Sequence, residues 1–498
     1  MSTDLGASVA VIGAGFSGLA AAAMLKREGV DDFVVLERAD DVGGTWRDNT
    51  YPGAACDVPS QLYSFGFDLN PNWSRSFSPQ QEIWDYLRDS ARRQGLLPHV
   101  RLGHELLDAR WDDTAGAWRL ETTGGPVSAR VLVNAAGPLS EPAVPALPGL
   151  ASFAGTTFHS GAWNHEHDLT GRRVAVVGTG ASAAQFVPCI QPDVERLYVF
   201  QRTPPWILPR ADRAVTALEQ WLYARVPPLQ RLVRSAIYVG RESYVLGFTV
   251  DQRIMRVIQR AALRHLERQV PDPALRAKLT PDYTMGCKRI VLSSDYYPAL
   301  GRDNVDVVTE PIDRVTRDAV VTADGTAHEV DTIVFGTGFR ATQPPIADRI
   351  RDADGRTLAG AWRERMRAYK GTTVAGFPNL FLLLGPNTGG GHTSVVLMAE
   401  AQIRYLREAL RFMRGYGVVA VDVRPEAMER YDAAVQRRME RTVWTRGGCR
   451  SWYLDENSRN TTLWPSFVGG FRRRTRHFDR EAYRVDARPR VDVPSALP

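Results

Sequence analysis

The sequence has few cysteines and no long apolar segment. Its four cysteines are widely separated among 498 residues, at Cys56, Cys189, Cys287 and Cys449. They are too few and too scattered to form a disulfide framework or a zinc site, which implies a reducing compartment. No apolar run reaches the roughly 20 residues that span a bilayer, and the N-terminal stretch lacks the basic start of a signal peptide. These features predict a cytoplasmic protein that does not enter a membrane.

A strong excess of charge of one sign is also missing. The 62 basic and 56 acidic residues give a formal net charge of +6, which fits a solvated, mildly basic surface. The densest basic run, 472–474 together with Arg476, contains no nucleic-acid motif, so we predict no nucleic-acid partner. The length exceeds what a single hydrophobic core serves and predicts two or more domains.

A glycine-rich segment near the N-terminus has the pattern of a dinucleotide-binding turn. Gly13, Gly15 and Gly18 follow an apolar run and precede a stretch of small residues, an order that predicts strand, tight turn and helix. Gly13 permits the turn, Gly15 allows a pyrophosphate to approach the backbone, and Gly18 lets the helix pack closely on the strand. Glu37 ends the next apolar run, at the spacing where an acid accepts hydrogen bonds from ribose hydroxyls.

A second glycine-rich segment repeats this pattern later in the chain. Gly178, Gly180 and Ser182 again lie between a strand-like run and a helix-like run. At the offset of the first unit's acid stands Arg202, followed by Thr203. Arginine pairs with a 2′-phosphate that an acid would repel, so this unit predicts NADP(H). One such pattern alone is often an ordinary turn, but two of them predict two dinucleotides, most simply FAD reduced by NADPH.

The order of strand-like and helix-like patterns predicts an α/β fold with two Rossmann-like domains. We place the first part of an FAD-binding domain at 1–140, before a proline-rich linker. An NADP-binding domain follows at 141–338, and helical spacing of apolar residues predicts a helical insertion in it at about 212–280. A further strand-like run and a helix-like run in 339–498 predict that the chain returns to the FAD-binding domain.

Residues 43–57 resemble a motif of type I Baeyer-Villiger monooxygenases. Gly43-Gly44-Thr45-Trp46 is followed after four residues by Tyr51-Pro52-Gly53 and after three more by Asp57, so every position of the family pattern is present. The resemblance implies that Gly44, Thr45, Trp46 and Asp57 contribute to cofactor binding. Trp46 also argues against the disulfide reductases of similar fold, which place a redox cysteine pair in this region.

Residues 153–164 resemble a second motif of the same family, with His159 and Trp163 at the expected spacing and Asn164 where the family has proline or aspartate. Related N- and S-oxygenating flavin monooxygenases usually carry phenylalanine or tyrosine at the position of Trp163, so the tryptophan favours the Baeyer-Villiger side. A packed interdomain hinge is compatible with the motif. We therefore predict that His159 and Trp163 couple domains.

The segment Gly286-Cys-Lys288-Arg289 resembles the context of the family's catalytic arginine. The resemblance implies that Arg289 is catalytic and that Lys288 assists binding of the NADP phosphate. A permanent guanidinium charge stabilises an anionic flavin peroxide and the charge that develops during its attack on a ketone. Asp57 would orient Arg289 through a carboxylate–guanidinium pair. Near the C-terminus, Trp452 resembles the tryptophan of a mobile loop that contacts cofactor or substrate.

Together these resemblances imply an FAD-dependent monooxygenase that uses NADPH and O2. Through a C4a-peroxyflavin it would insert one oxygen beside the carbonyl of a small-molecule ketone and give an ester or lactone. Two alternatives stay open. The protonated peroxide oxygenates amines and sulfides, so N- or S-oxygenation is the first, and a nucleotide-binding redox sensor without turnover is the second.

Overall fold

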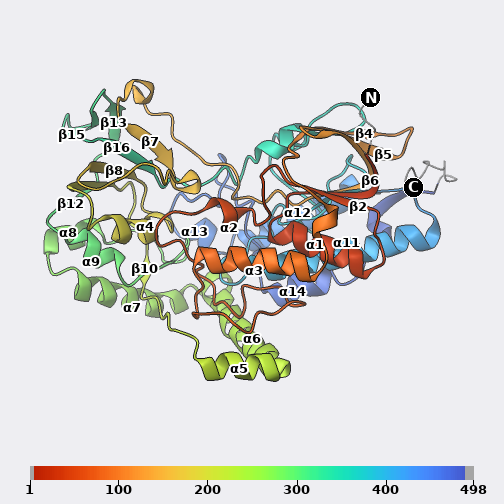
Figure 1. Cartoon of the computed structure of the whole chain (residues 1–498), viewed down its shortest axis with the longest axis horizontal. Coiled ribbons are helices and arrows are strands. Elements are labelled where there is room, and N and C mark those ends of the chain that lie inside the picture. The colour runs from red at the N-terminus through yellow and green to blue at the C-terminus, as the bar shows by residue number, and fades with distance from the viewer. Residues whose placement is uncertain (1–4, 488–498) are drawn as a thin grey trace.

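The computed structural model describes residues 5–487, which form two large β-sheets with helices packed on them (Figure 1). The first sheet has eight strands in the order β17-β4-β5-β6-β1-β2-β3, with β18 also paired to β6. The pairs β4–β5 and β5–β6 are antiparallel and the others are parallel. The strands are β1 (Leu5–Ile12), β2 (Phe33–Leu36), β3 (Val100–Arg101), β4 (Leu106–Asp112), β5 (Ala117–Thr122), β6 (Gly125–Asn134), β17 (Ile350–Arg351) and β18 (Leu380–Leu382).

The first βαβ unit forms because small residues let its helix lie against the sheet. Helix α1 (Phe16–Arg27) begins directly after the turn at Gly13, whose φ of +95° favours glycine. A Cβ atom at Gly18 would lie 1.8 Å from the carbonyl oxygen of Gly13, so only glycine permits this close packing. On its other side α1 packs against α11 (Val395–Tyr416). The N-terminus of α1 is thereby fixed at the end of β1.

Helices from both ends of the chain accompany the first sheet. They include α2 (Thr45–Asp48), α3 (Gln80–Arg93), α10 (Leu358–Ala361), α12 (Pro425–Met439) and α14 (Val468–Arg474). The short helix α13 (Val443–Arg446) lies against residues 246–250 instead. A small antiparallel sheet joins β19 (Ala420–Val423) to β20 (Tyr483–Asp486). The first sheet therefore draws its strands from two parts of the sequence, and the second sheet lies between them in chain order.

The second sheet is parallel and has the order β12-β9-β8-β16-β7. Its strands are β7 (Thr156–His159), β8 (Arg173–Val177), β9 (Arg196–Phe200), β12 (Val305–Val308) and β16 (Thr332–Phe335). Helices α4 (Ala183–Ile190) and α9 (Tyr296–Leu300) pack together beside it. Two small sheets complete this part: β10 (Ile207–Leu208) with β11 (Val291–Leu292), and β13 (Ile312–Val315), β14 (Ala319–Thr322) and β15 (Ala327–Glu329).

A helical segment lies in the chain between β10 and β11, after β9 and before β12 of the second sheet. It contains α5 (Ala217–Arg225), α6 (Pro227–Glu242), a π-helical turn at Leu246–Val250, α7 (Arg253–Gln269) and α8 (Pro273–Lys278). In Figure 1, α5 and α6 extend below both sheets. Within residues 5–487, none of the helices has the length and apolar character needed to cross a bilayer.

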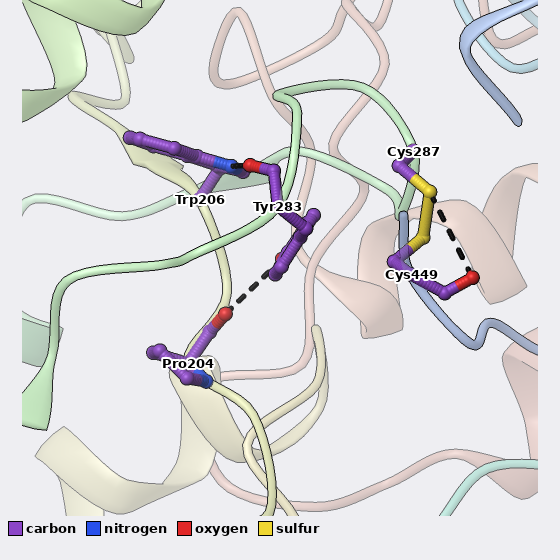
Figure 2. The surroundings of a disulfide bond; sticks show 5 residues. All are labelled: Pro204, Trp206, Tyr283, Cys287 and Cys449. Carbon is purple, nitrogen blue, oxygen red and sulfur yellow. Dashed lines mark hydrogen bonds between the residues drawn. A yellow bond between two sulfur atoms is a disulfide. The ribbon is translucent and has the colours of Figure 1, made fainter. Parts of the chain in front are cut away.

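One disulfide bond corrects the interpretation of the cysteines. Cys287 and Cys449 are bonded although 162 residues separate them in sequence, with a Cα–Cα distance of 6.1 Å (Figure 2). Cys56 and Cys189 are free. The sequence separation gave no sign of this pairing, because the fold and not the local spacing brings the two thiols together. The small number of cysteines therefore does not by itself indicate a reducing compartment.

Candidate active site

The first glycine turn and the segment 43–46 form one continuous surface. The amide of Gly43 donates to the carbonyl oxygen of Ala14 at 3.0 Å. A Cβ atom at Gly15 would lie 3.6 Å from the Cα atom of Gly44, so the two backbones approach each other closely. Thr45 and Trp46 begin the short helix α2 from this point, and the Trp46 indole donates to the hydroxyl of Tyr63 at 3.0 Å.

Glu37 lies beside the N-terminus of α1, as its position after β2 predicts. Its carboxylate accepts hydrogen bonds from the amides of Ala14 at 2.8 Å and Ala39 at 3.1 Å, and its side chain is almost fully buried. Arg47 donates to the same carboxylate at 3.0 Å. Sequence reasoning missed Arg47, although its place directly after Trp46 could have drawn attention to it.

The second glycine turn leaves open space in front of it. Gly178 has a φ of +108°, and a Cβ atom there would lie 2.6 Å from the carbonyl oxygen of Gly336. In contrast, a Cβ atom at Gly180 would have no neighbour within 4 Å. Ser182 is the N-cap residue of α4 but makes no side-chain capping bond to the helix backbone. A ligand can therefore approach the backbone at Gly180 and the N-terminus of α4.

Two basic side chains lie close to each other near this turn. Arg202 is exposed after β9, next to Thr203, whose carbonyl oxygen accepts from Thr179. Burial and, second, the positive charge of Arg202 together lower the pKa of Lys288 to about 8. Two cations that repel each other are suited to an anionic ligand between them, because its charge would offset the repulsion. A phosphate group meets this requirement.

Arg289 and Asp57 form a bidentate ion pair across 232 residues of sequence. Arg289 Nε and Nη2 each donate to one carboxylate oxygen of Asp57 at 2.6 Å. The side chains are 33% and 24% exposed, so the pair is held firmly but its edge stays open to a ligand. The pairing predicted from the two motifs is present, and it joins a segment beside the first glycine turn to one beside the second.

The charges of this pair stabilise each other. Burial alone would raise the pKa of Asp57, but the nearby Arg289 guanidinium outweighs it and holds that pKa below its usual range. The Asp57 carboxylate in turn raises the pKa of Arg289. Arg241 of α6 adds a weaker contact to the backbone carbonyl oxygen of Asp57 at 3.4 Å. Sequence reasoning did not identify Arg241, because no local pattern links the helical segment to Asp57.

His159 and Trp163 lie apart from this ion pair. The amide of Gly161 donates to His159 Nδ1 at 2.9 Å, and burial lowers the pKa of His159. A hydrogen bond with the backbone of Gly338 partly opposes this lowering. The Trp163 ring contacts Phe186 of α4 at a centroid distance of 5.2 Å. Neither residue contacts Arg289 in the described part of the chain, and their role in domain coupling stays a prediction.

Trp452 is at the surface of the C-terminal segment. Its side chain is exposed, and its ring packs on that of Tyr453 at a centroid distance of 4.5 Å.

Within residues 5–487, no group of three or more histidine, cysteine or acidic side chains is arranged to hold a metal ion. The candidate site is therefore built from two glycine turns, the basic pair and the Arg289–Asp57 ion pair.

Comparisons with known proteins agree with this arrangement. A model of flavin-binding monooxygenase-like proteins matches residues 6–358. A Baeyer-Villiger monooxygenase of Streptomyces coelicolor is 52% identical over 478 residues, which cover 96% of this chain and 92% of that protein. This chain belongs to the type I Baeyer-Villiger monooxygenases.

Solved structures of Baeyer-Villiger monooxygenases have the same fold. A closed crystal structure of cyclohexanone monooxygenase gives a TM-score of 0.87 at 29% identity, covering 97% of this chain and all of that one. A crystal structure of OTEMO in complex with FAD and NADP gives a TM-score of 0.86 at 27% identity, with 96% and 99% covered. The predicted α/β class with two Rossmann-like domains is confirmed.

Proposed function

We propose that this Baeyer-Villiger monooxygenase converts a small-molecule ketone into an ester or lactone, with FAD and NADPH as cofactors and O2 as co-substrate. The observation that carries the proposal is the partly open Arg289–Asp57 pair, which joins the segment 43–57 to the segment that carries Lys288. Its guanidinium charge is permanent and is available on the open edge. The related Baeyer-Villiger enzymes support the same reaction class.

The residues around the first glycine turn fit FAD. The amides at the N-terminus of α1 favour a pyrophosphate, and Gly15 and Gly44 let the two backbone segments beside it lie close together. Glu37 Oε1 already accepts from Ala39 and Arg47, whereas Oε2 accepts from Ala14 alone and keeps a lone pair for a ribose hydroxyl. When bound and reduced, the flavin supplies the oxygen-activating chemistry. The chain's own contribution is to hold the cofactor and to place Arg289 near the reacting carbonyl.

Arg289 acts on the charge that develops on the ketone oxygen. As oxygen inserts beside the carbonyl, negative charge grows on that oxygen, and a fixed cation lowers the energy of this state more than that of the neutral ketone. Asp57 holds the guanidinium in one orientation from the opposite side. Asp57 uses Nε and one Nη2 hydrogen, so the guanidinium keeps further Nη hydrogens with which it can meet the substrate oxygen.

The division of the chain follows from where the two turns lie. We propose that the body around the first sheet, 1–140 together with 339–498, holds FAD and that 141–338 holds NADPH. Side-chain contacts between the two parts support a coupled arrangement. Thr50 Oγ1 lies 2.7 Å from His165 Nε2, and this contact is two residues from Trp163.

Product analysis tests the reaction. Purified holoenzyme would be incubated with NADPH, O2 and a panel of cyclic, aryl and linear ketones, with sulfides and amines in parallel. We expect one ester or lactone per NADPH oxidised for at least one ketone, measured by mass spectrometry and absorbance. Sulfoxides or N-oxides as the only products would establish the alternative class. NADPH oxidation without any oxygenated product would contradict both.

Arg202→Ala is expected to weaken NADPH binding much more than NADH binding. Loss of one hydrogen bond to a charged group costs about 1.5 to 3 kcal/mol, which corresponds to roughly a tenfold to 150-fold increase in Kd. Only NADPH carries the 2′-phosphate that this arginine would contact. Flavin reduction rates at varied coenzyme concentration measure both affinities, and Arg314→Ala, at another exposed arginine, is the control. Equal losses for the two coenzymes would exclude the assignment.

The affinity for NADPH is expected to fall above about pH 8. The Lys288 pKa of about 8 belongs to the ligand-free protein, and a bound phosphate favours the charged lysine and raises that pKa. Binding is therefore strongest below pH 8 and weakens by about tenfold as the pH rises by one to two units. Affinity for NADH should change little. Lys288→Arg, which stays charged, should remove the pH dependence of NADPH affinity. If this variant keeps the pH dependence, a group other than Lys288 causes it.

A further inference from the structure

We propose that Tyr453 is a positioning residue for Arg289, and that the Cys287–Cys449 disulfide holds the loop carrying Tyr453 against the arginine. The inference rests on the proposed oxygenation of ketones. It assigns a role to the C-terminal segment 447–453, for which the sequence suggested only a mobile tryptophan. It also gives a purpose to the only disulfide found within residues 5–487.

The disulfide is adjacent to the catalytic segment. Cys287 directly precedes Lys288, is fully buried, and is joined to Cys449 (Figure 2). Figure 2 also places Tyr283 beside this bond, on the same stretch of chain. Lys288 Nζ lies 5.1 Å from the centroid of the Tyr283 ring. A cross-link at Cys287 therefore fixes the backbone from which both Lys288 and Arg289 extend.

The two cross-linked segments are also held together by contacts other than the disulfide. A Cβ atom at Gly447 would lie 2.6 Å from the Cβ atom of Cys287, so the backbone of one segment lies directly on the other. The amide of Thr284 donates to the carbonyl oxygen of Gly447 at 3.0 Å. Met285, Cys287, Val443 and Tyr453 all belong to one buried apolar cluster. The disulfide thus adds a covalent bond to two segments that already pack against each other.

Tyr453 is the residue of this loop that reaches the ion pair. Its side chain is 1% exposed, whereas its neighbour Trp452 is 45% exposed, so the two side chains point to different environments. Burial raises the pKa of Tyr453 to about 12, while the positive charge of the nearby Arg289 and a hydrogen bond with it oppose that rise. The amide of Thr461 donates to the carbonyl oxygen of Tyr453 at 3.3 Å, which holds the backbone in place.

A neutral acceptor suits this position better than a second acid. Asp57 already balances one side of Arg289, and another carboxylate would cancel the charge that the substrate oxygen needs. With a pKa of about 12, the Tyr453 hydroxyl stays uncharged at working pH. It can restrain the guanidinium while leaving its net charge available. Held by both partners, Arg289 loses less conformational freedom when it meets the substrate.

The test compares Tyr453→Phe with Tyr296→Phe in the full-length holoenzyme. Tyr296 is a matched control, because its buried hydroxyl has no partner among residues 5–487. For Tyr453→Phe we expect normal FAD content and anaerobic reduction by NADPH within about twofold of wild type. Ester formed per NADPH should fall about tenfold, the effect of losing one hydrogen bond to a charged group. A merely structural role would instead lower FAD content and slow reduction.

The disulfide is tested by Cys449→Ser, with Cys189→Ser as the control at a free cysteine. Cys449→Ser should lower ester per NADPH in the same direction, and adding it to Tyr453→Phe should cause little further loss, because both act through one contact. Thiol counting by alkylation and mass spectrometry verifies the bond. If Tyr453→Phe forms as much ester per NADPH as Tyr296→Phe, the proposed role of the tyrosine is wrong. If Cys287 and Cys449 of the wild type are alkylated as free thiols, the proposed role of the disulfide is wrong. Wild type that forms no ester at all would instead contradict the proposed function.

Discussion

Arg289→Ala is expected to bind FAD and accept electrons from NADPH normally, yet to lose ester formation by about a hundredfold to a thousandfold. The reason is that flavin reduction requires no charge at this position, whereas oxygen insertion develops negative charge on the ketone oxygen. The guanidinium is the permanent cation that Asp57 holds with two bonds of 2.6 Å. Losing a full charge should cost at least as much as losing one neutral donor at such a site.

Anaerobic stopped-flow measurements test whether NADPH reduces the flavin of Arg289→Ala normally. Quantified ester formation tests whether oxygen insertion is lost. Arg289→Lys is the informative companion variant, because lysine keeps the charge but cannot form the bidentate pair, and its ester formation should lie between those of wild type and Arg289→Ala. NADPH should still be consumed by the alanine variant, with hydrogen peroxide as the main product. Ester yield close to that of wild type would remove Arg289 from the mechanism.

Local sequence patterns predicted the parts of the fold that depend on neighbouring residues. Gly13 and Gly18 are required where the backbone itself crowds, so their spacing predicts the turn and the close packing of α1 on β1. The same reasoning predicted the second unit, from β8 through α4 to β9. The helical segment also follows from the spacing of its apolar residues. Each of the two βαβ units is encoded within about 30 residues.

Contacts between distant segments could not be found in this way. Nothing in the spacing of Asp57 and Arg289 indicates that they meet, and only the family resemblance suggested it. Cys287 and Cys449 lacked even that support, because a single pair 162 residues apart has no spacing pattern. Arg241 and Tyr453 contact the same ion pair from α6 and from the C-terminal loop. Their positions depend on how the helical segment and the last helices pack on the two sheets.

Asp57→Asn is expected to lower ester formation by about tenfold to a hundredfold, less than the loss of Arg289 itself. The amide keeps the size of the side chain but removes the negative charge, and one charged hydrogen bond is worth about 1.5 to 3 kcal/mol. Arg289 would keep its charge, because its pKa lies far above neutrality even without a partner. It would lose the bidentate hold that fixes its orientation, so the substrate oxygen would meet a less ordered cation.

A double-variant cycle decides whether Asp57 acts through Arg289. If it does, Asp57→Asn combined with Arg289→Ala should form ester no more slowly than Arg289→Ala alone, because the aspartate then has nothing to orient. Asp306→Asn serves as the control, since Asp306 pairs with Arg196 at the surface with both side chains 39% exposed and such pairs contribute little. FAD content is measured for every variant, so that a folding defect is recognised. Fully multiplicative losses in the double variant would mean that Asp57 contributes independently of Arg289, for example by holding the cofactor.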